Sequence, residues 1–240
     1  MVRKFPSARR KLKKLLQFPL DLSPVVDYTC GMETTERRRR ILDGVEPIFL
    51  EYGFHRVTTD EVATALGISK KTLYQEFGSK TELVRAMVRR KLERVEAALS
   101  AAVGRASPDP LGTHFWIVTR ELSHLGKPFL ADLAKHDPEL WDEVNEFRRE
   151  QIFSRFQEFV VQGREDGLVR AGVDPPIVAE LLLTAAEALL TPKKLTEVNM
   201  TPRDMVDQVA TIVAEGVLTD AGRRAYRSRG EGASGGGGDA

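Results

Sequence analysis

Residues 67–80, GISKKTLYQEFGSK, decide how the first third of the chain folds. A glycine turn leads into Ser69, a residue type favoured immediately before a helix because its side chain can accept a backbone N–H. Leu73 and Phe77 then fall four residues apart, on one face of that helix. Gly78 suits the left-handed conformation in which many helices end. The stretch therefore predicts a short helix with an apolar inner face and a polar outer face.

A second short helix is predicted just before this turn. Thr58 and Glu61 have the spacing of a capping box, in which each side chain accepts a hydrogen bond from the other residue's free backbone N–H. Val62, Ala65 and Leu66 are expected to form the inner face of this helix. Two short helices joined by a tight glycine-containing turn describe a helix-turn-helix, whose second helix enters the major groove of DNA.

Longer helical patterns flank this unit. Residues 35–52 carry apolar side chains at helical spacing, and Gly53 follows where a C-terminal cap is needed. Pro47 lies inside this pattern and predicts a kink rather than a break. Residues 79–82, Ser-Lys-Thr-Glu, repeat the capping-box spacing and begin a helix that should extend to Val103.

The outer face of the helix at residues 69–77 carries side chains suited to DNA. Lysine can contact phosphate or guanine, glutamine can pair with adenine through two hydrogen bonds, and tyrosine can bond phosphate. The alternative is that the lysines are ordinary solvated charges. The candidate DNA-contacting residues are Ser69, Lys70, Lys71, Thr72, Tyr74 and Gln75, with Thr58 and Lys80 holding the unit in register.

The distribution of charge supports a polyanionic partner. Residues 1–80 hold 15 Lys and Arg against 10 Asp and Glu, whereas residues 81–240 hold 21 against 25. A basic first third suggests that this part meets nucleic acid, although chance together with a basic tail gives the same totals. The single cysteine, Cys30, excludes an internal disulfide and a cysteine zinc site and fits a reducing compartment.

Residues 37–88 resemble the DNA-binding domain of the TetR family of bacterial regulators. The resemblance rests on the segments YGF, TTDEVA, GISK-x-TLY-x-x-F and SKTEL, while Lys71 stands where the family often has glycine. It implies that residues 37–40, four arginines, form a basic arm near the DNA backbone or minor groove; a solvated helix start is the alternative. It also implies DNA contacts for Thr58, Lys70, Thr72, Tyr74, Gln75 and Lys80.

The rest of the chain predicts an all-α fold, with residues 82–222 as a helical bundle. Helical spacing recurs between breaks rich in proline and glycine. Residues 175–190 are apolar nearly all round, so that helix must be covered on all sides. The resemblance implies a two-fold dimer interface made by this helix and residues 202–218, expected as the last two helices; a buried central helix in a monomer is the alternative. The other helices are expected at 82–103, 113–125, 128–137 and 138–166.

The resemblance also implies a pocket for a small molecule in the bundle. Each aromatic candidate could equally be plain core. The candidate ligand-binding residues are Phe115, Trp116, Thr119, Trp141, Phe147 and Thr184. Glu121 and His124 match half of a di-iron motif, but no second half exists. We find no nucleophile elbow, phosphate loop or two-histidine zinc helix, so neither an enzyme, a metal nor a cofactor is expected.

The sequence thus predicts a homodimeric, DNA-binding transcriptional regulator, expected to be a repressor that leaves a palindromic operator when a small molecule binds. The alternative is a DNA-binding protein of the same fold whose body binds a protein partner or no inducer. A bacterial cytoplasmic, nucleoid-associated location is expected, with no membrane contact. The expected domains are a basic, loosely ordered extension at 1–31, a helix-turn-helix domain at 33–81, a ligand-binding and dimerisation domain at 82–222, and a flexible glycine-rich tail at 223–240.

Overall fold

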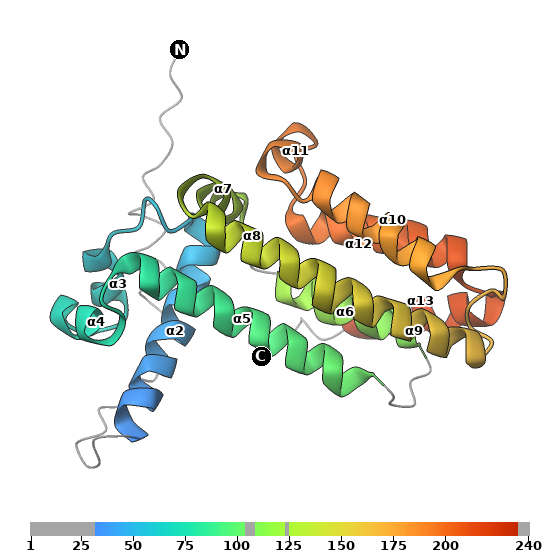
Figure 1. The fold of residues 1–240 in the computed structure, drawn as a ribbon, viewed down its shortest axis with the longest axis horizontal. Coiled ribbons are helices and arrows are strands. Elements are labelled where there is room, and N and C mark those ends of the chain that lie inside the picture. Colours follow the sequence, from blue (N-terminus) through green and yellow to red (C-terminus); the bar gives the residue numbers. More distant parts are fainter. Residues whose placement is uncertain (1–31, 104–108, 123–124, 235–240) are drawn as a thin grey trace. The chain divides into compact units, whose positions relative to one another are not determined.

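The computed structural model describes residues 32–103, 109–122 and 125–234 (Figure 1). Within these residues every regular element is a helix, and the single isolated β-bridge pairs Val169 with Leu218. The predicted all-α class is confirmed. The expected extension at 1–31 and the end of the glycine-rich tail lie outside the described residues. In the described ranges no helix has the length and apolar character that a membrane crossing requires.

The chain divides into two compact units, Met1–Met87 and Val88–Ala240, and the division falls within one continuous helix. In the first unit, buried side chains from successive helices meet at one core that includes Phe49, Leu73 and Phe77. The helices concerned are α2 (Met32–Tyr52), α3 (Thr59–Ala65), α4 (Lys70–Phe77) and the first turns of α5 (Lys80–Ala102).

The helix ends of this unit follow the predicted signals closely. The Glu61 backbone N–H donates to Thr58 Oγ1 at 3.2 Å and the Thr58 N–H donates to Glu61 Oε2 at 2.8 Å, so the capping box is confirmed. Gly53, Gly67 and Gly78 all have positive φ angles, of 78°, 64° and 68°. Each helix of the unit is therefore ended or joined by a residue that tolerates a left-handed backbone.

Three local predictions for this unit were wrong or incomplete. Helix α2 begins at Met32, three residues before the predicted start, although it does continue through Pro47 without a break, as predicted. Ala63, rather than Ala65, lies buried on the inner face of α3. At the start of α5 Ser79 Oγ does accept the Glu82 N–H at 3.1 Å, but the Ser79 N–H donates to the Phe77 carbonyl oxygen instead of closing a reciprocal box.

The second unit is a bundle in which α6 and α12 pack together, α9 packs on α6, and α10 packs on α9 and α12 (Figure 1). Its core is apolar and includes Leu111, Phe156, Val160 and Ala214, each at most 1% exposed. The elements are α6 (Pro110–Leu122), α7 (Lys127–His136), α8 (Pro138–Phe147), the π-helix η1 (Arg148–Phe153), α9 (Ser154–Glu165), α10 (Pro175–Leu189), α11 (Pro192–Glu197), α12 (Pro202–Val217) and α13 (Asp220–Ser234).

This unit departs from the predicted helices in three places. Helix α6 starts at Pro110 rather than residue 113, because Asp109 Oδ1 accepts the Gly112 N–H at 2.8 Å and caps the earlier turn. The long helix predicted at 138–166 contains the π-helical segment η1. Residues 175–190 and 202–218 do not form the last two helices, since α11 separates them and α13 follows.

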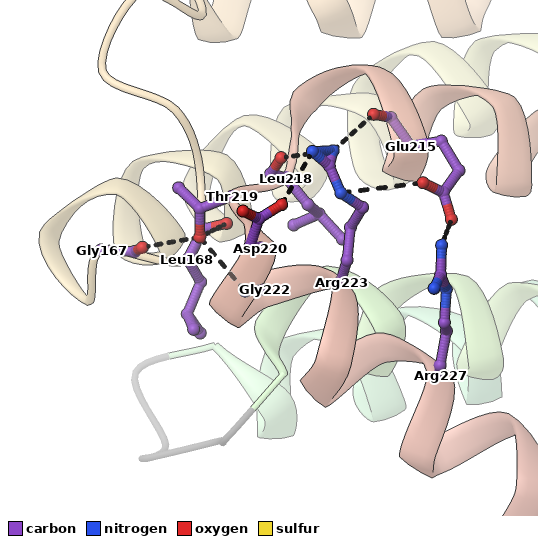
Figure 2. A network of polar contacts seen from close by, with 9 residues as sticks. All are labelled: Gly167, Leu168, Glu215, Leu218, Thr219, Asp220, Gly222, Arg223 and Arg227. Carbon is purple, nitrogen blue, oxygen red and sulfur yellow. Dashed lines mark hydrogen bonds and ion pairs between the residues drawn. The ribbon is translucent and has the colours of Figure 1, made fainter.

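Helix α13 is held by a polar network where residues 223–240 were predicted to be a flexible tail (Figure 2). Thr219 Oγ1 donates to the Gly167 carbonyl at 3.0 Å and accepts the Gly222 N–H at 3.2 Å. One turn later Arg227 forms an ion pair with Glu215 at 2.6 Å. The network offsets the low helix propensity of this glycine-rich segment, which is why composition alone predicted the wrong structure.

We predict that Gly222→Ala destabilises the protein. A Cβ atom at this position would lie 2.2 Å from the Leu168 backbone carbonyl oxygen, which cannot move without disturbing the bridge to Leu218. We expect a loss of about 1–3 kcal/mol in the free energy of unfolding, measured by urea denaturation. Gly172→Ala is the matched control, because nothing lies within 4 Å of its added Cβ. Equal stability of the two variants would contradict this packing.

Candidate functional sites

The bundle contains a largely apolar cavity of about 90 Å³ that is partly open to its surroundings. Side chains from α6, η1, α10 and α12 form its wall, including Phe115, Ile152 and Phe153. Two of the lining residues, His114 and Arg148, are polar. An apolar site with a few placed polar groups is the usual form of a small-molecule site, although this one is compact.

His114 is a buried polar residue on the wall of this cavity. Its side chain is 2% exposed and its ring lies 5.4 Å, between centroids, from the rings of Phe156 and Phe159. Its Nδ1 atom has no hydrogen-bond partner among the described residues. Burial lowers the pKa of His114 to about 3, so the imidazole is neutral at physiological pH.

The structure does not gather the predicted ligand-binding residues into one site. Phe115 lines the cavity, and Thr119 is buried behind it, donating to the Phe115 carbonyl oxygen at 2.8 Å. Trp116 lies 42% exposed, under the Arg120 guanidinium. The other three candidates lie apart: Trp141 packs beside Leu130, Phe147 packs beside Leu99, and Thr184 is exposed on α10.

Glu121, weighed above as half of a metal motif, forms an ion pair with Lys91 at 3.1 Å, and His124 lies outside the described residues. In the described ranges no three metal-binding side chains lie close enough to share an ion. His114 and Arg148 were not among the ligand-binding candidates predicted from the sequence, because helical spacing alone does not show which polar side chains of a bundle line a cavity.

In the first unit, α4 presents one buried and one exposed face. Leu73 and Phe77 are 2% and 4% exposed and anchor the helix in the core. Lys70, Lys71 and Gln75 lie on the solvent side. The predicted division into an inner and an outer face is therefore present, and the outer face carries the side chains proposed to contact DNA.

The candidate residues on this face differ in what they already bind. Lys70 Nζ lies 2.9 Å from Asp60 Oδ2, and this hydrogen bond raises the pKa of Lys70. Ser69 Oγ accepts the Thr72 N–H at 3.0 Å and lies 2.8 Å from Thr72 Oγ1, so the two hydroxyls cap the helix. The side chains of Lys71 and Gln75 have no hydrogen bond or ion pair within the part of the chain that the structure describes.

The remaining candidates tie α4 to its neighbours. The Tyr74 hydroxyl lies 3.3 Å from Thr59 Oγ1, at the corner between α3 and α4. The Thr58 hydroxyl donates to Glu61 Oε2 at 2.9 Å within the capping box. Lys80 Nζ donates to the His55 carbonyl oxygen at 3.3 Å. These contacts position the helix-turn-helix, and a phosphate would have to share or replace them.

The four arginines at 37–40 do not form an arm, because all of them lie within helix α2. Arg39 and Arg40 bond the Glu36 carboxylate at 2.7 and 3.0 Å, and these hydrogen bonds lower the pKa of Glu36 to about 2. Arg37 lies 3.7 Å from the Glu76 carboxylate. Charged partners at helical spacing account for this order at the start of α2.

Arg38 has a different role, which sequence reasoning missed. Its guanidinium donates to the Glu76 backbone carbonyl and lies 4.2 Å from the centre of the Phe77 ring. It thereby satisfies a carbonyl at the C-terminal end of α4, where positive charge is favourable. The signal was available, since Arg38 precedes the buried Ile41 and Val45 by three and seven residues and so shares their face of α2.

We predict that Arg38→Met loosens α4. Methionine keeps apolar contact with Phe77 but cannot bond the Glu76 carbonyl, so we expect a local loss of about 1–2 kcal/mol. Hydrogen–deuterium exchange should show faster exchange in residues 70–77 and no change in residues 125–234. Arg40→Met is the matched control, because the partner of Arg40 among the described residues is Glu36, at the exposed start of α2. Unchanged protection of α4 in Arg38→Met would refute this role.

The chain matches proteins of known function. Residues 41–87 match the family model for "Bacterial regulatory proteins, tetR family". The chain is 35% identical over 68 residues to the transcriptional activator FasR of Mycolicibacterium smegmatis, a match covering 28% of this chain and 31% of FasR. It is 24% identical over 193 residues to the transcriptional repressor DhaR of a Mycobacterium species, covering 78% of this chain and 95% of DhaR.

Solved structures share the fold. A transcriptional regulator from Saccharomonospora viridis, solved in complex with choline, superposes with a TM-score of 0.57 at 18% identity, covering 77% of this chain and 99% of that chain. At that identity the likeness shows the fold alone. Together with the family model and the curated relatives, it places the helix-turn-helix and the helical body in one known architecture. Residues 41–87 therefore form a DNA-binding domain of the tetR family of bacterial regulatory proteins, and the curated relatives that the chain matches are transcriptional regulators.

Proposed function

We propose that this chain is a homodimeric repressor that binds a palindromic operator in the bacterial chromosome. It leaves the operator when a small molecule binds in the second unit, Val88–Ala240, which we call the body. The observation that carries the proposal is the outer face of α4. Lys71 and Gln75 stand exposed there, on a helix anchored by Leu73 and Phe77. A rigid helix with uncommitted polar side chains suits reading of base edges in the major groove.

On this proposal the candidate residues make different kinds of contact with DNA. Gln75 contacts adenine and Lys71 contacts guanine or phosphate. Lys70 exchanges its exposed bond with Asp60 for a phosphate oxygen. The remaining candidates, whose side chains already fix the corner, contribute phosphate contacts that hold the register: Thr58, Ser69, Thr72, Tyr74 and Lys80.

Dimerisation is supported by exposed apolar side chains on two helices that pack together. Ile177 and Leu181 on α10 are 69% and 59% exposed, and Ile212 on α12 is 71% exposed. An apolar stripe of this kind favours burial against a second copy, which presents the same stripe across a two-fold axis. The interface predicted from residues 175–190 and 202–218 is thus retained as a proposal, although α13 follows these helices.

Release by a ligand requires that the ligand bind two states of the dimer differently. Helix α5 belongs to both units, so a change in the body can be passed to the DNA-binding unit along one continuous element. The cavity beside His114 supports the existence of a ligand. Repression is favoured over activation because DhaR, similar over 95% of its length, is a repressor, whereas the similarity to the activator FasR covers 31% of that protein.

The first experiment is selection of bound fragments from random double-stranded DNA by the full-length protein at a fixed salt concentration. We expect one palindrome whose half-sites lie about 34–36 Å apart. In a screen of small molecules, at least one compound should then release the protein from this operator. Recovery of sequence-independent binding alone would contradict the proposed repressor.

We predict that Gln75→Ala relaxes the preference at one base pair of each half-site, because the pair with adenine is lost. The selected DNA should bind about ten- to one-hundredfold more weakly, while a non-specific duplex binds as before. Lys71→Ala is the comparison variant and should weaken both duplexes with a smaller dependence on salt. If Gln75→Ala leaves the base preference intact, α4 is placed wrongly on DNA.

We predict that Leu181→Arg produces a monomer, since it places a charge in the proposed two-fold stripe. Light scattering after size exclusion should report half the native mass, and operator affinity should fall by at least about tenfold because the two half-sites are no longer joined. Val161→Arg is the control, because Val161 is 46% exposed on α9 and lines a depression that it shares with residues of α5 and α6. A Leu181→Arg protein that stays dimeric would place the interface elsewhere.

A further inference from the structure

The cavity in the body is not evenly apolar, and its two polar residues suggest what it binds. Arg148 lines this cavity and also a separate depression on the surface, and Leu190 is shared in the same way. Arg148 therefore stands where the apolar interior meets solvent. His114 lines the interior and has no partner for its Nδ1 atom among the described residues.

The positively charged guanidinium of Arg148 has only some of its possible hydrogen-bond and charge partners among the described residues. Its guanidinium donates to Asn145 Oδ1 at 3.0 Å and lies 5.4 Å from the Trp141 ring centre. No carboxylate of the described residues lies within 4.0 Å of it. Burial lowers the pKa of Arg148 to about 10, which leaves it charged at physiological pH.

The nearby carboxylates bond a different arginine directly, although the charge of Glu187 also acts on Arg148 and partly offsets the effect of burial on its pKa. Arg149 bonds Glu187 at 2.9 Å and Glu146 at 2.8 Å, on the exposed side of the depression. The depression also holds Asp142 and is not cationic as a whole. Selection of an anion must therefore come from direct contact with Arg148 rather than from a field that attracts anions at long range.

The local backbone around Arg148 is also unusual. Arg148, Ile152 and Phe153 belong to the π-helical segment η1, and all three line the cavity. One extra residue per turn breaks the α-helical register, and such segments occur often at functional sites. Here the segment brings a cation and two apolar side chains to one wall.

We infer that the cavity binds a short-chain apolar carboxylic acid, whose carboxylate meets the Arg148 guanidinium while His114 bonds it or its neighbouring atoms from the interior. This deepens the proposed function, on which it rests, by naming the class of effector. The planar guanidinium matches a carboxylate through two parallel hydrogen bonds. A volume of about 90 Å³ favours a short aliphatic chain over a long one.

The test is calorimetric titration of the full-length protein with pentanoate, pentanamide and pentylamine at one pH and ionic strength. These probes share a chain and differ in charge. Pentanoate should bind, pentanamide should bind about tenfold more weakly or worse, and pentylamine should not saturate. Acids longer than the cavity should gain no further affinity. Equal binding of acid and amide, or a preference for pentylamine or choline, would overturn the inference.

Variants of adjacent arginines sharpen the test. Arg148→Met should abolish the preference for acid over amide, whereas Arg149→Met should keep it, because Arg149 lines the outer depression and is not part of the cavity wall. His114→Phe should weaken pentanoate binding at unchanged far-ultraviolet circular dichroism. If Arg148→Met does not fold, the comparison of acid with amide in the native protein still decides. A preference that survives in folded Arg148→Met overturns the assignment.

Operator release separates this inference from the proposed function. If pentanoate binds through Arg148 but leaves the protein on its operator, the class of ligand stands and the proposed release is wrong. If another compound releases the operator while no acid binds, the proposed function stands and the acid assignment is wrong.

Discussion

The first unit depends on how the short helix α4 is held. Eight residues are too few to form a stable helix alone, so its direction is set by what it packs against. Leu73 and Phe77 fill the core from one side, and Arg38 covers the ring of Phe77 and bonds the Glu76 carbonyl from the other. A single side chain of α2 thus joins the apolar anchor of α4 to its polar end.

If α4 contacts DNA as proposed, this arrangement separates the residues that give affinity from those that give specificity. Thr58, Tyr74 and Lys80 already bond protein atoms, so they offer DNA a fixed geometry and little adaptable reach. Lys71 and Gln75 are uncommitted, and only the glutamine can pair with one base through both a donor and an acceptor. An unchanged scaffold can therefore acquire a new operator by changing few residues, with Gln75 the foremost.

What could be predicted follows from how local each signal is. Thr58 with Glu61, Ser69 with Thr72 and the glycines after helices act within a few residues, and all were readable. Arg38, which acts across 38 positions, was hidden in a run of four arginines. Helix α13 was missed because its glycine content argues against a helix, and because the contact that holds its start, from Thr219 to the Gly167 carbonyl, joins residues 52 positions apart. The π-helical segment η1 was not predicted, because the spacing of apolar residues does not distinguish a π-helical turn from an α-helical one.

The body contains buried polar side chains that lower the stability of the fold. An unpartnered buried imidazole costs about 1–3 kcal/mol, and a phenylalanine at residue 114 would pack among the rings of Phe156 and Phe159 without that cost. The desolvation of Arg148 acts in the same direction. Because both groups line one cavity, the ligand inferred above would recover part of this free energy in a state of the protein in which it can bond them. The ligand would then bind more tightly to the state in which it can bond these groups. A ligand-controlled regulator requires such a difference in ligand affinity between two states.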